Sequence, residues 1–159
     1  MFSAIKSSVL ISLVKGKWLQ FFKDRPVNQL LTDSRKNFTG EDVLFIAFTG
    51  AGRDGHQFIE DLYQKGVRQF LVTHEIDCHL LPEANVLQVD SAIKALQQVA
   101  AFRRSTFNIP VIGITGSNGK TIIKEWLYQV LEPEHAVVKS PASYNSQIGV
   151  PLSVWQMEE

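Results

Sequence analysis

The segment 111–121, with the sequence V-I-G-I-T-G-S-N-G-K-T, contains the residue types of a phosphate-binding loop. A β-branched run leads into a turn with glycines at 116 and 119, where the missing side chains let backbone N–H groups approach an anion. Lys120 supplies a cation for the terminal phosphates, and the Thr121 hydroxyl group is a ligand for Mg²⁺. The helix expected after the loop directs the positive end of its dipole at the same anion. The sequence therefore predicts an ATP-type site formed by Gly116, Ser117, Asn118, Gly119, Lys120 and Thr121.

This loop departs from the common pattern G-x-x-x-x-G-K-[ST], because Ile114 stands where that pattern has its first glycine. The alternative is a surface turn of Gly-Asn-Gly type followed by a lysine. The order of strand, turn and helix favours the phosphate loop. The helix is predicted from an apolar stripe at the helical period, which ends before Pro133, and we expect this stripe, Trp126 included, to be buried. Its members are Ile122, Ile123, Trp126, Leu127, Val130 and Leu131.

Two further polar segments follow predicted strands. The tetrad T-D-S-R at 32–35 has side chains suited to a phosphate or sugar, although such a tetrad is more often an Asx-type turn. The segment 49–56 combines three glycines with Arg53 and His56 between a buried strand and a helix, where ligands bind in α/β folds. From the residues alone, a binding loop and a plain turn are equally open for 49–56.

Two other segments carry weaker signals. The cluster 74–79, H-E-I-D-C-H, has donors for zinc, but its spacing matches none of the usual structural zinc patterns, so a solvated turn is favoured. Segment 140–152 is predicted to connect a strand at 136–139 to a helix that begins near Val150 or Pro151. It is either a capped loop or a loop that positions substrate or metal beside the phosphate site.

The elements that must position these residues alternate along the chain. Strands are predicted at 17–22, 43–48, 67–73 and 85–89, and helical segments at 2–14, from Asp54 to Gly66, and at 91–106. The apolar run 43–48 predicts a strand buried on both faces. Asp54 is expected to cap its helix, with Gln57 at the capping-box position. This alternation predicts an α/β domain with a largely parallel sheet.

A domain boundary is predicted after the polar residues that precede Pro110, which gives domains 1–107 and 108–159. Pro110 is expected to open the strand, through about residue 114, that leads into the phosphate loop. The second part is shorter than the roughly 100 residues that a nucleotide-binding α/β domain needs. We therefore expect that domain to be incomplete in this chain.

Composition narrows the function classes. The 16 basic residues balance the 16 acidic ones, so the sequence offers neither the basic excess nor the basic stripe that a nucleic-acid partner favours. The apolar run 9–14 is too short for membrane insertion. The single cysteine, Cys78, cannot form an internal disulfide, which fits a cytoplasmic location.

Three motifs, in the same order as in the family, make the chain resemble the Mur ligase family of peptidoglycan synthesis. They are T-D-S-R followed by V-L-F-I-A-F-T-G-A-G-R-D-G-H-Q-F-I, then T-G-S-N-G-K-T, and finally Y-N-S-Q-I-G-V-P-L. The resemblance extends from about residue 30 to the end and is closest to the D-alanyl-D-alanine-adding branch. The segments G-S-N-G-K-T-I-I-K-E-W-L and S-Y-N-S-Q-I-G-V-P-L-S-V-W are similar to ligases of Bacteroidetes type that are fused to an alanine racemase.

The resemblance implies an N-terminal α/β domain that binds a UDP-linked precursor, followed by the truncated start of a P-loop central domain. It implies an ATP- and Mg²⁺-dependent reaction in which the carboxylate of UDP-MurNAc-tripeptide becomes an acyl phosphate that the amine of D-Ala-D-Ala attacks. Lys120 and Thr121 are then the catalytic residues, with Thr121 on Mg²⁺. The residues implied to face the precursor are Ser34, Arg35, Gly50, Arg53, His56 and Asn145, the last of which is near either the precursor or the metal.

We expect this chain, as an N-terminal fragment, not to catalyse ligation alone. Two alternatives stay open. The chain is a UDP-nucleotide-binding module without chemistry of its own, or it is an unrelated small-molecule kinase with a variant phosphate loop.

Overall fold

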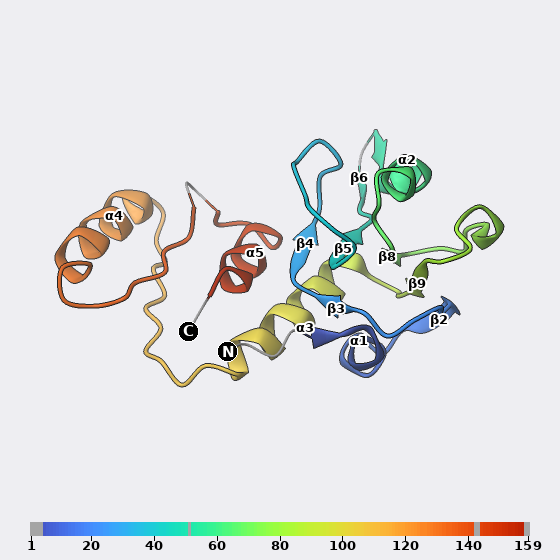
Figure 1. The fold of residues 1–159 in the computed structure, drawn as a ribbon. Helices are drawn as coiled ribbons and strands as arrows, with labels where there is room; N and C mark the ends of the chain where they lie inside the picture. The colour runs from blue at the N-terminus through green and yellow to red at the C-terminus, as the bar shows by residue number, and fades with distance from the viewer. Residues whose placement is uncertain (1–4, 51, 142–143, 158–159) are drawn as a thin grey trace. The chain divides into compact units, whose positions relative to one another are not determined.

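The computed structural model describes residues 5–50, 52–141 and 144–157, with the side chain of Arg53 left out, and it contains two compact units, 1–99 and 100–159 (Figure 1). The division falls inside helix α3 (Ala92–Ser105), so the helix continues from one unit into the other. The family domain boundary expected between residues 107 and 108 stays a prediction. No helix among the described residues combines the length and apolarity needed to cross a membrane.

Unit 1 is built on a five-stranded sheet with the strand order β2-β9-β8-β5-β4. Neighbouring strands pair in parallel from β4 to β9, while β2 at the edge runs antiparallel to β9. The strands are β2 (Lys17–Gln20), β4 (Gln29–Leu31), β5 (Val43–Ile46), β8 (Gln69–Val72) and β9 (Asn85–Gln88). Every residue of β5 and β8 is buried. The predicted α/β fold with a largely parallel sheet is confirmed, and so is the burial of β5 on both faces.

Two small antiparallel pairs and short helices surround this sheet. The pairs are β1 (Ile5–Lys6) with β3 (Pro26–Val27), and β6 (Thr49–Gly50) with β7 (Arg53–Asp54). The helices of unit 1 are α1 (Ser7–Val14), the 3₁₀ helix η1 (Gly55–Phe58), α2 (Ile59–Gln64), the 3₁₀ helix η2 (Cys78–Leu80) and α3.

The predicted helical segments are confirmed in position but differ in detail. The helix expected from Asp54 to Gly66 divides into η1 and α2, with the Asp54 carboxylate accepting a hydrogen bond from the backbone N–H of His56 at 3.0 Å. Gly66 ends it with a φ of 101°, a backbone conformation that favours glycine. The segment expected at 2–14 contains both β1 and α1, and its first three residues lie outside the described ones. The helix expected at 91–106 is α3.

One hydrophobic cluster of unit 1 forms between the sheet and α2. Phe45 of β5 and Phe70 of β8 meet edge to face with ring centroids 6.4 Å apart. Around them lie buried Leu31, Val43, Ala47, Ile59, Leu62, Val67, Val72, Leu81, Ala84 and Val86. This packing fixes the carboxyl ends of the strands, from which the candidate binding loops leave.

A buried polar network joins the N-terminal segment to the sheet. The Ser7 hydroxyl group donates to the Gln69 side-chain oxygen at 2.6 Å and accepts from the Asn85 amide at 3.0 Å. The Gln69 amide donates to the carbonyl oxygen of Pro26 at 2.8 Å, and Asn85 donates to that of Lys23 at 2.7 Å. Because these three side chains are at most 1% exposed, the network holds segment 22–27 against the sheet at a position where no water competes.

Unit 2 contains the end of α3, α4 (Lys120–Leu131) and α5 (Gly149–Trp155). Its buried side chains gather around Arg103, whose guanidinium group lies 5.0 Å from the ring centroid of Phe107 and 5.6 Å from that of Trp155. Arg103 also donates to the backbone oxygen of Met157. A planar cation between two aromatic rings stabilises this small cluster.

Two strands predicted in unit 2 are absent. The described residues 111–114 and 136–139 have extended or irregular backbone without strand pairing, and Val111 and Ile112 are 60% and 62% exposed. A strand needs a neighbour for its N–H and C=O groups, and the described part of unit 2 offers none.

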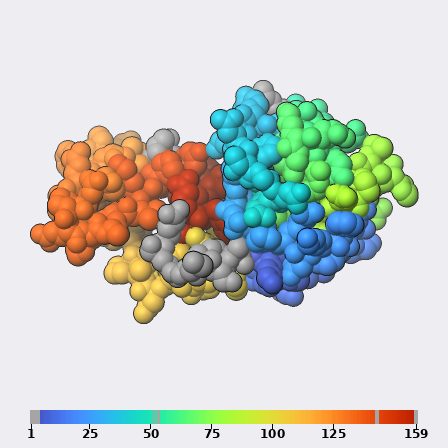
Figure 2. Space-filling view, viewed as in Figure 1, coloured from blue at the N-terminus to red at the C-terminus, as the bar shows by residue number. Residues whose placement is uncertain are grey.

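The predicted burial of the apolar stripe on α4 is wrong. Ile122, Trp126 and Val130 are 57%, 65% and 73% exposed, and Figure 2 shows this helix, in orange, at the surface. The period of the stripe correctly predicts the helix, but the described residues of unit 2 contain no sheet on which the stripe could pack.

Candidate functional site

The phosphate loop leads directly into the first turn of α4. Gly116 and Gly119 have φ values of 145° and 80°, both in the region that favours glycine, and Gly119 is the residue before the helix. The backbone N–H of Ile123 donates to the Gly119 oxygen at 2.9 Å, which closes the first helical turn. Residues 115–119 are exposed, so the loop is open to a ligand. The helix of 12 residues supplies free N–H groups and a dipole at this end.

Lys120 is the first residue of α4, and its ammonium group donates back to the Gly116 carbonyl oxygen. A second carbonyl oxygen, that of Ser117, lies 3.5 Å from the same Nζ atom. The lysine side chain therefore folds back over the loop. The exposed Thr121 hydroxyl group follows in the same turn. One hydroxyl ligand is a donor set that fits Mg²⁺, which takes most of its ligands from water and phosphate oxygens.

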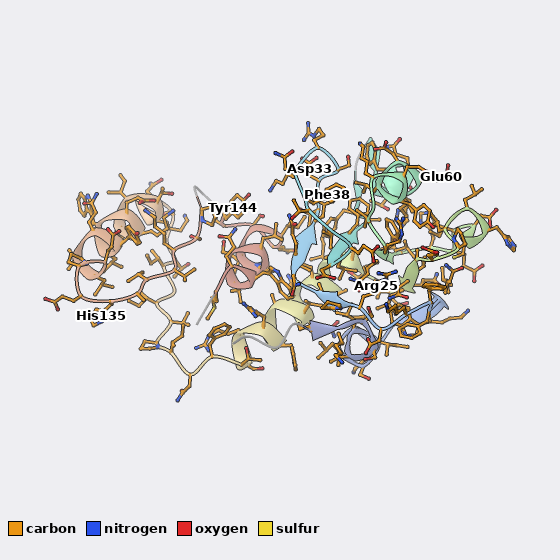
Figure 3. All side chains as sticks on the ribbon, viewed as in Figure 1. Arg25, Asp33, Phe38, Glu60, His135 and Tyr144 are labelled. Atoms are coloured by element: carbon orange, nitrogen blue, oxygen red, sulfur yellow. The ribbon has the colours of Figure 1, made fainter. Side chains whose placement is uncertain are left out.

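Asn145 lies in the loop before α5 and is exposed. The next residue, Ser146, accepts a hydrogen bond from the N–H of Gly149 at 2.9 Å, and its carbonyl oxygen accepts one from Val150 at 3.1 Å. A Cβ atom added to Gly149 would lie 2.9 Å from the Cα atom of Tyr144, a residue seen in Figure 3 beside α5. The predicted helix start near Val150 or Pro151 is confirmed, and the loop closes tightly onto it.

A charged cluster on α4 ties this second loop to the phosphate-loop helix. Lys124 donates to the carbonyl oxygen of Ser140 at 2.8 Å, and Glu125 binds Lys139 at 2.5 Å. The Lys139 ammonium group also lies 3.8 Å from the ring centroid of Tyr128. The hydrogen bond from Lys139 lowers the pKa of Glu125 and raises that of Lys139. These contacts fix where the chain enters the loop that carries Asn145.

In unit 1, the polar segments follow the carboxyl ends of three adjacent parallel strands. Segment 32–35 follows β4, the β6–β7 hairpin follows β5, and Thr73 with His74 follows β8. Ligands of open α/β sheets bind outside this edge. The fold therefore brings the predicted Ser34, Arg35, Gly50 and Arg53 positions, and His56, to one edge of the sheet.

Asp33, labelled in Figure 3, and Arg35 form a closed polar turn after β4. The Asp33 carboxylate accepts from the Arg35 backbone N–H at 3.1 Å and from its guanidinium group at 2.9 and 2.7 Å. These hydrogen bonds hold the pKa of Asp33 well below its usual range and raise that of Arg35. The Asx-type turn is confirmed. Ser34 lies half-buried between them, and the exposed Arg35 side chain keeps donors for a second anion.

His56 is held by hydrogen bonds on both ring nitrogens. Its Nδ1 lies 2.5 Å from an Asp54 carboxylate oxygen, and its Nε2 accepts from the backbone N–H of Thr73 at 3.0 Å. The side chain is 5% exposed, and the ring of His74 stacks on it at 3.8 Å between centroids. Hydrogen bonds from the His56 backbone and ring lower the pKa of Asp54.

Among the described residues, Asp54, His56 and His74 form the one group whose ligand atoms, within 4.8 Å of one another, have the spacing of a metal site. The Thr73 N–H can only donate, so Nε2 of His56 is unprotonated and Nδ1 carries the proton. A metal on Nδ1 would displace this proton, and a neutral ring would then carry its proton on Nε2, opposite an N–H that can only donate. This group therefore does not fit a metal ion. In the cluster 74–79, Asp77 instead caps η2 by accepting from the His79 N–H at 2.9 Å.

Several residues that shape the site lie inside the quoted motifs, but the sequence did not indicate which site residues they contact. Asp33 and Asp54 orient Arg35 and His56, and Lys124 with Glu125 anchors the Asn145 loop. The Asp-x-Arg and Asp-x-His spacings, which suit a carboxylate that caps its own turn, are the available signal for the first two. The charged pair 124–125 is a signal only once the helix is known, because its partners lie 14 to 16 residues further along the chain.

Comparison with known proteins agrees with this geometry. Residues 114–159 match the model of the Mur ligase middle domain. The chain is 35% identical over 139 residues to a UDP-N-acetylmuramoyl-tripeptide–D-alanyl-D-alanine ligase of Bacillus subtilis, covering 87% of this chain and 30% of that protein. It is 35% identical over 160 residues to the enzyme of the same name from Borreliella burgdorferi, covering 94% of this chain and 34% of that protein.

Solved structures give the same relationship. A crystal structure of MurF from Acinetobacter baumannii superposes with a TM-score of 0.84 at 27% identity, covering 98% of this chain and 34% of that one. MurF ligase from Thermotoga maritima in complex with ADP has a TM-score of 0.71 at 28% identity, with coverages of 82% and 29%. The chain spans about a third of the length of the relatives it matches. With the phosphate loop, the parallel sheet and these matches, the chain belongs to the Mur ligase family.

Proposed function

We propose that this chain is part of an ATP-dependent ligase that joins D-Ala-D-Ala to UDP-MurNAc-tripeptide in peptidoglycan synthesis. The observation that carries the proposal is the phosphate loop, with Lys120 folded over Gly116 at the start of α4, in a chain 35% identical to ligases of that name. The reaction converts the precursor carboxylate to an acyl phosphate with loss of ADP. The amine of D-Ala-D-Ala then displaces phosphate and forms the amide.

In this proposal each unit has a separate task. Backbone N–H groups of residues 116–119 cradle the phosphates, and Lys120 neutralises charge that develops on the transferred group. When bound through Thr121, Mg²⁺ supplies further charge neutralisation at the phosphate oxygens. Asn145 contacts the precursor or the metal. The loops after β4 and β5, with Ser34, Arg35, Gly50, Arg53 and His56, serve the uridine diphosphate end, and the reaction takes place in the cytoplasm.

The second candidate function is a UDP-nucleotide-binding module. It is favoured by the contrast between unit 1, with its closed core, and unit 2, whose α4 stripe is exposed. In this case the precursor binds to unit 1 while the 159-residue chain does no chemistry. No particular contact favours an unrelated kinase.

Calorimetry and a turnover assay on the purified 159-residue chain test these functions. We expect the UDP-linked precursor to bind, and we expect no phosphate release when ATP and both substrates are present. Release of phosphate only with both substrates would show that the chain is itself a competent ligase. Transfer of phosphate to a non-peptide acceptor would support the kinase. Failure to bind the precursor would overturn the role given to unit 1. The predicted fusion to an alanine racemase is tested by sequencing the DNA beyond the codon for Glu159.

A further inference from the structure

We propose that His56 is a positioning residue that locks the β6–β7 hairpin to the carboxyl end of β8, so that the hairpin is preorganised for a nucleoside diphosphate. The ring lies between two elements that are distant in sequence, the hairpin that follows β5 and the end of β8, the strand that pairs with β5. Through Nδ1 it binds Asp54, the last residue of β7, and through Nε2 it accepts from Thr73, the first residue after β8.

The base of the hairpin leaves little freedom for another arrangement. The N–H of Gly55 donates to the carbonyl oxygen of Phe48 at 2.8 Å, and a Cβ atom added to Gly55 would lie 2.9 Å from the Phe48 nitrogen. The same Asp54 oxygen that binds the ring accepts from the His56 N–H at 3.0 Å and lies 3.4 Å from the Thr49 hydroxyl group. A single carboxylate therefore joins both strands of the hairpin to the imidazole.

The hydrogen bond between His56 and Thr73 matters for stability because the His56 side chain is buried. The His56 side chain is 5% exposed, and it lines a hollow of about 250 Å³ with Ile59, Glu60, Ile76, Asp77 and Leu81. Without the imidazole, the Thr73 N–H at the end of β8 would lose its acceptor in a place where little water reaches it. A neutral ring with its proton on Nδ1 satisfies both neighbours at once, whereas the other tautomer would place two donors opposite each other.

This arrangement gives His56 a different task from direct ligand contact. Both ring nitrogens are used inside the protein, so the ring acts on a ligand through the backbone of β6 and β7. Holding a loop in its bound geometry raises affinity because less conformational freedom is lost on binding. The inference rests on the proposed function to the extent that the ligand is a uridine diphosphate.

The test compares two substitutions in the full 159-residue chain. His56→Gln keeps an acceptor that can reach Thr73, while His56→Leu removes it at similar volume. His79→Leu is the matched control, because His79 is an exposed histidine of the same unit. The measurements are ¹⁵N spectra of the His56 ring, hydrogen exchange of the Thr73 amide, and calorimetric affinity for uridine diphosphate.

We expect the wild-type ring to be the neutral tautomer with its proton on Nδ1. In His56→Leu, exchange of the Thr73 amide accelerates and uridine diphosphate affinity falls about tenfold, while His56→Gln recovers most of both and His79→Leu changes neither. A proton on Nε2, or a Thr73 amide equally protected in His56→Leu, would overturn the inference. If uridine diphosphate does not bind even to the wild-type chain, the function proposed for this edge fails, and the ring and amide measurements still decide the role of His56.

Discussion

The ammonium group of Lys120 and the carbonyl oxygen of Gly116 form a hydrogen bond across one turn of the phosphate loop. The contact places the cation over the loop, on the side where residues 115–119 are exposed. When a phosphate binds here, the Lys120 ammonium group donates to the phosphate instead of to Gly116, and the Gly116 carbonyl oxygen accepts a hydrogen bond from water. The exchange is favourable because the new partner carries a full negative charge.

Replacing Lys120 is therefore expected to weaken nucleotide binding. Hydrogen bonds to charged groups contribute about 1.5–3 kcal/mol, so Lys120→Met should lower ATP affinity by about 10- to 100-fold. The measurement is calorimetry with ATP and Mg²⁺. Lys94→Met, at an exposed position of α3, serves as the charge-matched control. Equal ATP affinities of the two variants would show that Lys120 does not contact the nucleotide.

The Asp33–Arg35 turn predicts a pH dependence. The guanidinium group of Arg35 lowers the pKa of Asp33 from its ordinary value of 3.8, so the turn is stabilised at pH above 3.8 and this stabilisation is lost as pH falls through the lowered pKa. Arg35→Gln should return the pKa of Asp33 toward 3.8. A ¹³C titration of the Asp33 carboxyl group measures both values. An unchanged midpoint in the variant would show that the ion pair is not formed in solution.

The buried network around Ser7 predicts that removing the Ser7 hydroxyl group lowers the stability of the protein. Ser7→Ala removes the hydroxyl group that donates to the Gln69 side-chain oxygen, while the Asn85 amide keeps its hydrogen bond to the Lys23 carbonyl oxygen. One buried polar group left unsatisfied costs about 1–3 kcal/mol. We expect the free energy of unfolding in urea to fall by about 1–3 kcal/mol. Ser8→Ala is the neighbouring control, since the Ser8 hydroxyl group binds Asp24 at the surface. A cost as small as that of Ser8→Ala would mean that water replaces the lost hydroxyl group.

Substitution of the two tryptophans of unit 2 should change the free energy of unfolding by very different amounts. Trp155 is 9% exposed beside Arg103, and Trp155→Ala is expected to cost about 3 kcal/mol. Trp126 is 65% exposed, so Trp126→Lys should change the free energy of unfolding by less than about 0.5 kcal/mol. Urea unfolding followed by far-UV circular dichroism reads both. Strong destabilisation by Trp126→Lys would show that the α4 stripe is covered in solution.

Local signals in the sequence predicted the parts of this fold that local physics determines. The buried run that became β5, the capping carboxylate of Asp54 and the glycines around the phosphate loop each act within a few residues. The strand expected at 111–114 did not form, because a strand depends on a neighbour that periodicity cannot supply. Trp126 is exposed for the same reason. A helical stripe shows that one face is apolar and does not show what covers it.

The candidate site was predicted in its positions more fully than in its contacts. The side-chain chemistry of Lys120, Arg35 and His56 predicts a role in binding, and the fold puts the last two at one edge of the sheet. The His56 ring accepts a hydrogen bond from Thr73, 17 residues away, and Lys124 donates one to Ser140, 16 residues away. Such pairs are set by strand order and helix packing, which a single sequence does not contain.

The close approach of Gly149 to Tyr144 makes one segment sensitive to volume rather than to charge. A methyl group at position 149 would meet the Tyr144 backbone at 2.9 Å, so the chain would have to move beside Asn145. An alanine there would leave every polar group of the loop in the sequence and still displace the asparagine side chain from its place. The tolerance of this loop to mutation therefore depends on the space for one carbon atom at position 149. That position lies four residues after Asn145, whose side chain would be displaced.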